Sequence, residues 1–148
     1  MLKEAEIRTF IEGATRYFEI SGGQAASLGS PYLVTDGNPG AYTFTGVITI
    51  SGARRGIVYF TAPSGMLTVL LMRMQETDTS TENFRDLVGE VANTIAGNAR
   101  REFGKTFLVS VPHVVAPGEE TAAMPHARSY VIPINWRSHS AKLVVCLE

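Results

Sequence analysis

The feature that most constrains the fold is an order of secondary-structure signals that occurs twice along the chain. The first copy opens with residues 2–20, whose apolar side chains recur at the spacing of an amphipathic helix. The SGG of residues 21–23 ends this helix. Three runs rich in β-branched and aromatic residues follow, and they predict strands at residues 30–35, 41–51 and 54–62.

The second copy opens at a capping box formed by Thr79 and Glu82, which predicts the start of another long helix, and Gly104 ends it. Three further strand-like runs follow at residues 105–115, 128–136 and 141–148. Between the two copies, residues 64–76 are apolar enough for either a buried helix or a strand. Pro63 and the Met and Leu content favour a helix there, with the proline as its first residue.

The repeated order predicts an α/β sandwich with a duplicated, pseudo-two-fold arrangement. Short links between the strands favour about six strands in a mostly antiparallel sheet, and the two long helices are expected on one of its faces. The sequence has 148 residues and contains no low-complexity segment or linker that would divide it. We therefore predict a single domain over residues 1–148.

Composition excludes several classes of function. The chain is 45% hydrophobic, which suffices for a core, and its net charge of −1 comes without a dense basic cluster, so nucleic-acid binding is not expected. Cys146 is the one cysteine, so neither an internal disulfide nor a cysteine-based metal site can form. The N-terminal residues are charged, and the longest apolar run is too short to span a bilayer. We expect a cytoplasmic protein that binds neither nucleic acid nor membrane.

One face of the second helix carries an unusual row of residues. Within DLVGEVANTIAGN, a helix that advances about 100° per residue places four residues in one narrow stripe: Asp86, Glu90, Asn93 and Gly97. Apolar residues cluster on the opposite side: Phe84, Val88, Val91, Ile95 and Ala99. The helix is expected to bury the apolar side and to present the stripe outward.

Two interpretations of this stripe are open. Polar residues opposite an apolar face are the default of any surface helix. Asn and Gly, however, have weak helix propensity and cost up to about 1 kcal/mol relative to Ala at exposed positions, so solubility alone would not favour them. Gly97 also removes bulk one turn beyond Asn93, which would let another backbone approach. The stripe therefore suggests a docking ridge with a carboxylate and an amide at its centre.

The same stretch resembles the signature helix of the CheX/CheC/FliY chemotaxis phosphatases. In that family an acid or serine, a glutamate and an asparagine recur at the spacing of Asp86, Glu90 and Asn93. The segment TGVITISGARRGIVYFTAP resembles the hairpin that precedes this helix, and LVSVPHVV resembles the strand that follows it. The size of the chain and its repeated order of one helix and three strands resemble CheX in particular.

The resemblance implies an activity, a partner and residue roles. CheX-like proteins hydrolyse the aspartyl phosphate of receiver domains such as CheY. Glu90 would pair with the active-site lysine of the receiver, and Asn93 would enter the receiver's pocket and orient the attacking water. Magnesium would belong to the receiver, and the chain would need no cofactor of its own. Asp86 and Gly97 would contact the partner, Gly97 by giving clearance.

Elementary chemistry agrees with these roles. An aspartyl phosphate is already activated, so positioning a water and stabilising charge are most of the task. A neutral amide both donates and accepts hydrogen bonds, and it brings no negative charge near the phosphoryl group. A lysine in its place could not accept a hydrogen bond from water.

The two copies differ at this motif. The EGAT of residues 12–15 matches the EVAN of residues 90–93, but Thr15 replaces the asparagine, so we expect one site where CheC-like relatives have two. Those relatives also place a proline after the asparagine. Pro112 and Pro117 are near that position at neither expected spacing, so neither is assigned a role. The resemblance further implies a homodimer joined through sheet edges.

Other candidate sites have weaker support. His113, His126 and His139 are scattered without a neighbouring ligand pattern, so no metal site is predicted. Asp86 and Glu90 could form an acid–base pair for a small substrate, but an exposed ridge is not a pocket.

Three further features have interpretations that are not catalytic. The arginines of GARRG are expected to be solvated, with contact to an acidic partner as the alternative, and the aromatic residues of the first helix are expected in the core. The alternative to an enzyme is a non-catalytic module that docks receiver, chemosensory or flagellar proteins through the same helix.

Overall fold

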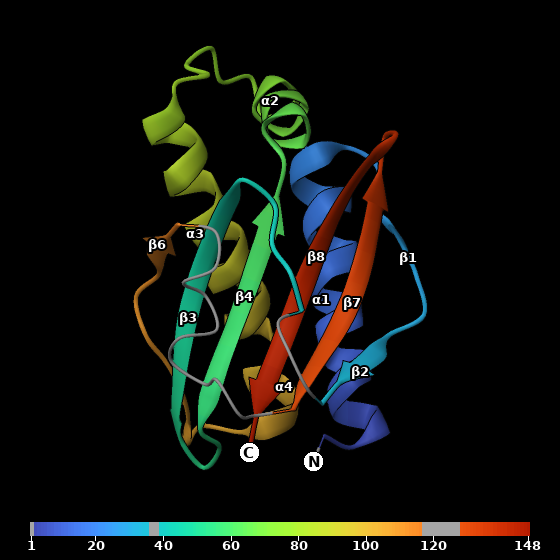
Figure 1. Cartoon of the computed structure of the whole chain (residues 1–148), viewed down its shortest axis with the longest axis vertical. Helices are drawn as coiled ribbons and strands as arrows, with labels where there is room; N and C mark the ends of the chain where they lie inside the picture. The colour runs from blue at the N-terminus through green and yellow to red at the C-terminus, as the bar shows by residue number, and fades with distance from the viewer. Residues whose placement is uncertain (1, 36–38, 117–127) are drawn as a thin grey trace.

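The computed structural model places the two long helices against one face of a single antiparallel sheet (Figure 1), which confirms the predicted fold class. It describes residues 2–35, 39–116 and 128–148. The helices are α1 (Glu4–Gly22), α2 (Ser64–Arg73), α3 (Thr81–Asn98) and α4 (Arg100–Phe103). The strands are β1 (Ser27–Leu28), β2 (Tyr32–Val34), β3 (Phe44–Gly52), β4 (Gly56–Ala62), β5 (Phe107–Val109), β6 (His113–Val115), β7 (Ser129–Trp136) and β8 (His139–Leu147). None of the helices in these ranges is long and apolar enough to cross a membrane.

The two halves of the chain exchange their short strands. In the first half, α1 is followed by β1, β2 and the β3–β4 hairpin; in the second half, α3 and α4 are followed by β5, β6 and the β7–β8 hairpin. β1 and β2 pair with β7, whereas β5 and β6 pair with β3. The order β1-β7-β8-β4-β3-β5 is unchanged when the halves are interchanged, as the predicted pseudo-two-fold arrangement requires.

The sheet buries apolar side chains on both faces. Successive residues of a strand point to opposite faces, so Phe60 of β4 packs in the core beneath the helices while Tyr59 belongs to a second buried cluster on the other face. The Tyr59 hydroxyl donates to the Gly40 carbonyl oxygen at 3.2 Å, so the segment that precedes β3 lies over this second face.

Gly46 lets α3 lie directly on β3. A Cβ atom built on Gly46 would stand 2.5 Å from the Val88 carbonyl oxygen and 2.7 Å from the Gly89 backbone nitrogen. No side chain fits in that space, so a larger residue would push the helix off the sheet. This contact immediately precedes Glu90 and holds the helix at the level of the predicted site.

The predicted start of the second long helix is wrong by one residue. Ser80 is the N-cap of α3, and its hydroxyl accepts from the Asn83 N–H at 3.2 Å. The Ser80 N–H donates to the Asp78 carboxylate at 2.9 Å, which turns the chain just before the helix and favours Ser80 over Thr79 as the cap. Glu82 then falls at the second helical position and not at the third, which a capping box needs.

The end of this helix also differs from the prediction. α3 ends at Asn98, and the chain continues after Ala99 into the short α4. Gly104 terminates α4 with a φ of 91°, a conformation that favours glycine.

Over the described residues the sheet has eight strands, where about six were predicted from the sequence. Residues 105–115 form two strands, because the Ser110 hydroxyl accepts the Thr49 N–H at 2.9 Å in place of a backbone carbonyl, and Pro112 has no N–H to donate. β1 is too short to produce an alternating pattern. Pro63, expected as the first residue of a helix, is instead the N-cap of α2, although the helix itself is confirmed.

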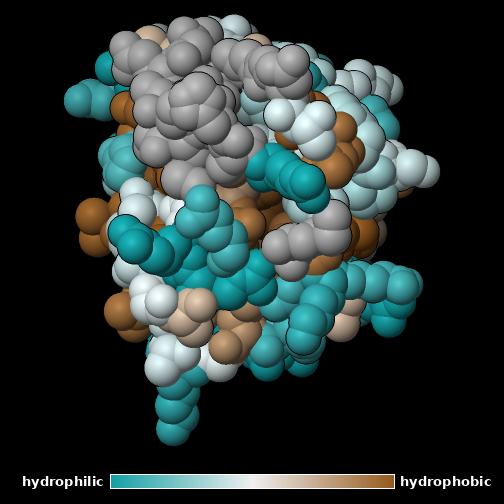
Figure 2. All heavy atoms as spheres, turned by 60° about the horizontal axis from the view of Figure 1, so that its bottom comes forward, coloured by the Kyte–Doolittle hydropathy of each residue, from teal (hydrophilic) through white to brown (hydrophobic). Residues whose placement is uncertain are grey.

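An ion pair ties α1 to the turn between β3 and β4, at the end of the molecule that Figure 2 brings forward and where hydrophilic side chains gather. Arg54 Nη1 lies 2.7 Å from Glu6 Oε2, and Arg54 Nε donates to the Glu148 carbonyl oxygen at 2.7 Å. Burial raises the pKa of Glu6, but the Lys3 N–H and Arg54 outweigh this effect, and the pKa is lowered overall. The prediction of solvated arginines is therefore wrong for Arg54, while Arg55 is exposed.

Candidate functional site

The helix α3 turns the residues of the stripe away from the core. Its opposite face is buried at Phe84, Val88, Val91, Ile95 and Ala99. Along the stripe, Asp86 and Glu90 are exposed, whereas Asn93 and Gly97 are half-buried. Glu90 and Asn93 are three residues apart, so their side chains emerge on the same side of the helix, one turn from each other.

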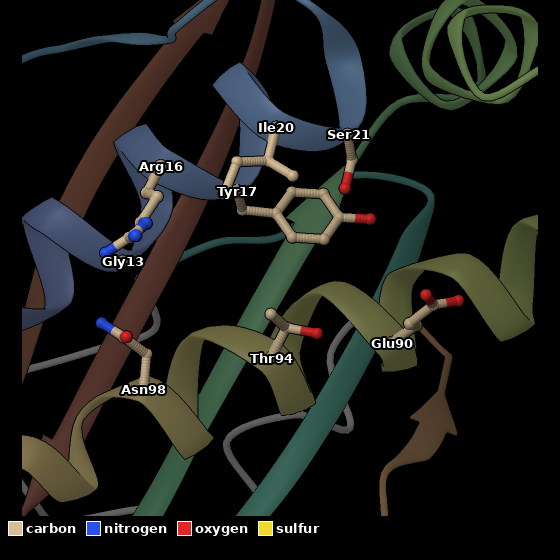
Figure 3. Close-up of a pocket in the computed structure, with 8 residues that line it drawn as sticks. All are labelled: Gly13, Arg16, Tyr17, Ile20, Ser21, Glu90, Thr94 and Asn98. Atoms are coloured by element: carbon tan, nitrogen blue, oxygen red, sulfur yellow. The ribbon is translucent and has the colours of Figure 1, made fainter.

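Glu90 stands on a ridge between two grooves. The first groove lies between α1 and α3, has a volume of about 300 Å³, and is lined by Tyr17 and Ser21 of α1 and by Glu90 and Thr94 of α3 (Figure 3). The second lies on the other flank of α3, has a volume of about 290 Å³, and also contains Glu90. The carboxylate of Glu90 therefore borders both grooves, while Asn93 borders only the second.

Pro112 borders the second groove together with Asn93. A Cβ atom on Gly89 would stand 3.0 Å from Pro112 Cβ, so the glycine makes room for the proline ring against α3. The ring has no rotatable side chain and gives this groove a rigid wall beside the amide of Asn93. Pro117 lies outside the described residues.

The polar side chains at equivalent positions of α1 and α3 differ in their hydrogen bonding. Among the described residues, the Asn93 amide makes no hydrogen bond, and the Glu90 carboxylate makes neither a hydrogen bond nor an ion pair. On α1, the hydroxyl of Thr15 donates to the Ile11 carbonyl oxygen at 2.9 Å and is satisfied within its own helix. The amide and carboxylate of α3 are thus left available to another molecule.

Tyr17 lines the first groove together with Glu90, and no sequence signal singled it out. It is only 6% exposed, as expected for a core aromatic residue, yet its hydroxyl oxygen is buried without a hydrogen-bond partner in the described ranges. Figure 3 shows this hydroxyl at the end of the groove where Ser21 and Glu90 lie. Burial raises the pKa of Tyr17 to about 12, the charge of Glu90 adds to the rise, and the nearby Ser21 hydroxyl partly opposes it.

Gly97 lies against open space. A Cβ atom there would meet nothing within 4 Å, so no contact within the described part of the chain requires a glycine. On α1, by contrast, a Cβ atom on Gly13 would stand 3.3 Å from the Asn98 amide nitrogen. The absence of a side chain at Gly97 therefore leaves the surface beyond Asn93 flat.

The remaining candidate residues do not come together. His113 lies on β6, His139 packs beside Gly65 at the start of α2, and His126 lies outside the described residues. Cys146 is 2% exposed on β8, and burial raises the pKa of its thiol. Across the described ranges, no three His, Cys, Asp or Glu side chains are grouped so that they could hold a metal ion.

Comparison with known proteins places this site in a family context. The sequence profile of the family described as "Chemotaxis phosphatase CheX" matches residues 44–135, which include the whole of α3. No curated protein sequence matches the chain.

Several solved structures share the fold. A CheC-like superfamily protein from Shewanella sp. PV-4 superposes with a TM-score of 0.83 at 21% identity, over 99% of each chain. The chemotaxis protein CheX from Vibrio vulnificus superposes with a TM-score of 0.79 at 20% identity, over 97% of this chain and 99% of that one. A CheX–CheY–BeF3–Mg²⁺ complex from Borrelia burgdorferi contains a chain that superposes with a TM-score of 0.74 at 15% identity, over 97% of each chain.

Proposed function

Because the chain belongs to the chemotaxis phosphatase CheX family, we propose that it hydrolyses the aspartyl phosphate of a CheY-like receiver domain. The observation that carries the proposal is a carboxylate and an amide one turn apart on α3, neither hydrogen-bonded within the described chain. Glu90 and Asn93 supply these groups, and both border an open groove on the flank of the helix. A site that is incomplete within one protein fits an enzyme that completes the reaction centre of another.

In this proposal Asn93 enters the receiver's pocket and orients the attacking water. Its amide oxygen accepts from the water while its amide N–H donates to a neighbouring oxygen, which fixes the direction of attack on phosphorus. The ring of Pro112 lies against α3 at Gly89, and it forms a wall of the groove that Asn93 also borders. In this proposal the rigid wall reduces the reorganisation of the amide when the receiver docks.

Glu90 is proposed to pair with the active-site lysine of the receiver. The carboxylate is exposed on the ridge between the two grooves, so an approaching ammonium group reaches it without displacing a partner from the described ranges. Such a pair fixes the register of the two proteins and strengthens as docking excludes water.

The receiver is proposed to supply the magnesium ion. The Borrelia burgdorferi complex contains CheX together with CheY, BeF3 and Mg²⁺, which supports a receiver as the partner of a CheX-fold protein. Asp86 and Gly97 flank the working pair on the exposed stripe, and we assign them to partner contact. The open space above Gly97 supports clearance for the receiver backbone.

The test is the rate of phosphate loss from phosphorylated receivers of the same cell. Wild-type protein is expected to accelerate the loss for at least one receiver, and Asn93→Ala to lower the acceleration by a factor of about 100 or more, because one positioned polar group is lost. Thr15→Ala on α1 is the matched control and should keep full activity. If wild-type protein binds a receiver without accelerating phosphate loss, the chain is a docking module and not an enzyme.

A homodimer is proposed as well, joined through sheet edges. The edge formed by β5 and β6 carries Leu108, 52% exposed, and the intervening Val111 is 81% exposed. Light scattering in solution measures the mass directly: twice the chain mass is expected, and a monomer at micromolar concentration would contradict the proposal.

A further inference from the structure

The hydroxyl of Tyr17 is buried at the edge of the groove between α1 and α3 and has no hydrogen-bond partner among the described residues. A buried hydroxyl without a hydrogen-bond partner is destabilising, so phenylalanine would satisfy the packing of α1 better than tyrosine. The ring itself packs against Phe18 at 5.5 Å between centroids, which phenylalanine would preserve. The hydroxyl, not the ring, therefore needs a function.

The nearest charged acceptor that shares the groove with this hydroxyl is Glu90. Both line the groove between α1 and α3, and they are close enough for the carboxylate charge to affect the ionisation of the phenol. Arg16, the other charged residue of this groove, is a donor and cannot accept the phenol proton. Ser21 lies near this hydroxyl on the same helix (Figure 3), and its own hydroxyl is neutral and carries no charge to hold the phenol.

Glu90 in turn lacks support on its own helix. It is exposed, makes no hydrogen bond within the described chain, and has several freely rotating side-chain bonds. Fixing such a side chain in one rotamer costs conformational entropy. A donor in the adjacent groove would offset part of that cost.

The pseudo-two-fold relation provides an internal comparison. Aligning Glu12 with Glu90 places Tyr17 of α1 opposite Ile95 of α3. Ile95 is buried and has no polar atom in its side chain, so no phenol hydroxyl stands at the equivalent position for Glu12, which borders a groove with Asn98 and Arg101 instead. The Tyr17 hydroxyl therefore faces the glutamate of the Glu–Asn pair on α3. The glutamate of α1, which has no asparagine beside it, is not faced by an equivalent hydroxyl.

We propose that Tyr17 is a positioning residue for Glu90. When the receiver docks, the carboxylate of Glu90 turns over the groove, the Tyr17 hydroxyl donates to one of its oxygens, and the other oxygen accepts from the receiver lysine. The phenol stays protonated throughout, so no proton is transferred. The inference rests on the proposed phosphatase function and adds a role for the first helix in it.

The test compares two Tyr→Phe variants in the phosphate-loss assay. Tyr17→Phe is expected to lower the rate about tenfold, the loss of one hydrogen bond to a charged group, while its melting temperature stays equal or rises. Tyr59→Phe is the matched control: it removes a hydroxyl that bonds to Gly40 on the other face of the sheet, so it should lose stability and keep activity.

Repeating the comparison in the Glu90→Asp variant distinguishes a role of Tyr17 in positioning Glu90 from a role in packing. In Glu90→Asp the shorter carboxylate does not reach the groove, so adding Tyr17→Phe should cause no further loss. Equal rates for Tyr17→Phe and wild type would overturn the inference while the phosphatase function stands. So would a tenfold loss that persists in the Glu90→Asp background, or one that comes with a lowered melting temperature. An inactive wild type would instead overturn the proposed function, and this inference with it.

Discussion

The two halves of the chain have nearly the same architecture and differ in what they place on the surface. Each half contributes one long helix, a pair of short strands and a long hairpin, and the sheet order is the same from either end. Yet α3 presents Asn93 without a hydrogen-bond partner in the part of the chain that the structure describes, whereas α1 carries Thr15, whose hydroxyl is used within its own helix. The fold is therefore shared by both halves, while the chemistry is concentrated on one.

Two further differences between α1 and α3 lie near the position where Thr15 replaces the asparagine. Gly89, which lets Pro112 approach α3, aligns with Ile11 on α1, and that side chain packs against the core instead. The phenol of Tyr17 aligns with the apolar Ile95. We therefore expect a site on this fold to require neighbouring residues such as Gly89, Pro112 and Tyr17 in addition to the Glu–Asn pair.

The largest expected effect comes from giving α3 the residue of α1. Asn93→Thr should lower phosphatase activity by a factor of about 100 or more, because a threonine hydroxyl is too short to orient water in a receiver pocket. The reverse change, Thr15→Asn, should add no activity to the Asn93→Thr variant, since α1 lacks the surrounding residues. Steady-state phosphate release measures both, and activity regained in the double variant would mean that the Glu–Asn pair is sufficient.

A second change tests how closely α3 is fixed to the sheet. Gly46→Ala should destabilise the protein by about 3 kcal/mol, because the new Cβ atom would collide with the Val88 carbonyl oxygen. Urea unfolding followed by circular dichroism gives the free energy of unfolding. A loss below about 0.5 kcal/mol would show that the helix moves away from β3 at little cost.

A third change concerns the tether of α1. Glu6 has a pKa below its ordinary value of 4.5 in the folded protein, so its contribution to stability is complete above that value and is lost as the pH falls through the folded pKa. Glu6→Gln should therefore cost about 1–2 kcal/mol at pH 7, and the difference from wild type should disappear in acid.

Melting temperatures measured from pH 7 to pH 3 check this expectation. Glu4→Gln is the control, because the Glu4–Arg8 pair is exposed, with 89% of the Glu4 side chain accessible. A gap between wild type and Glu6→Gln that widens in acid would contradict the assignment.

The smallest expected effect comes from Gly97, where the same change as at Gly46 should have the opposite sign. Gly97→Ala meets nothing within 4 Å and should stabilise the helix by about 0.5–1 kcal/mol. If the glycine gives clearance, the same variant binds a beryllofluoride-activated receiver more weakly than wild type. Calorimetric titration compares the two affinities, and equal values would remove Gly97 from the contact.

Local patterns predicted the parts of the structure that depend on local geometry. Helical periodicity gave α1 and α3 to within a few residues, and it gave the exposed side of α3, because spacing along a helix maps directly onto direction in space. The choice of cap at Ser80 was missed because Thr79 and Ser80 are both suitable, and a contact with Asp78 decides between them.

Local sequence patterns did not predict the contacts between segments that are far apart in the chain. The pairing of β1 and β2 with β7 is set by packing of the whole sheet, since strands of two or three residues carry too little sequence to specify a partner. The approach of Pro112 to Gly89 and of Tyr17 to Glu90 likewise depends on how the helices lie on the sheet. The sequence therefore predicted the residues of the stripe on α3, but it did not predict that Pro112 and Tyr17 lie beside them.

The exchange of short strands has a consequence for how the chain assembles. The outer strand of each long hairpin pairs with short strands of the opposite half. Neither half alone could therefore pair the outer strand of its own hairpin. Pairings between such distant segments raise the contact order and slow the search for the native state. A backbone nicked between α2 and α3 would yield two fragments with complementary open edges, which would be expected to reassociate by strand addition rather than remain apart.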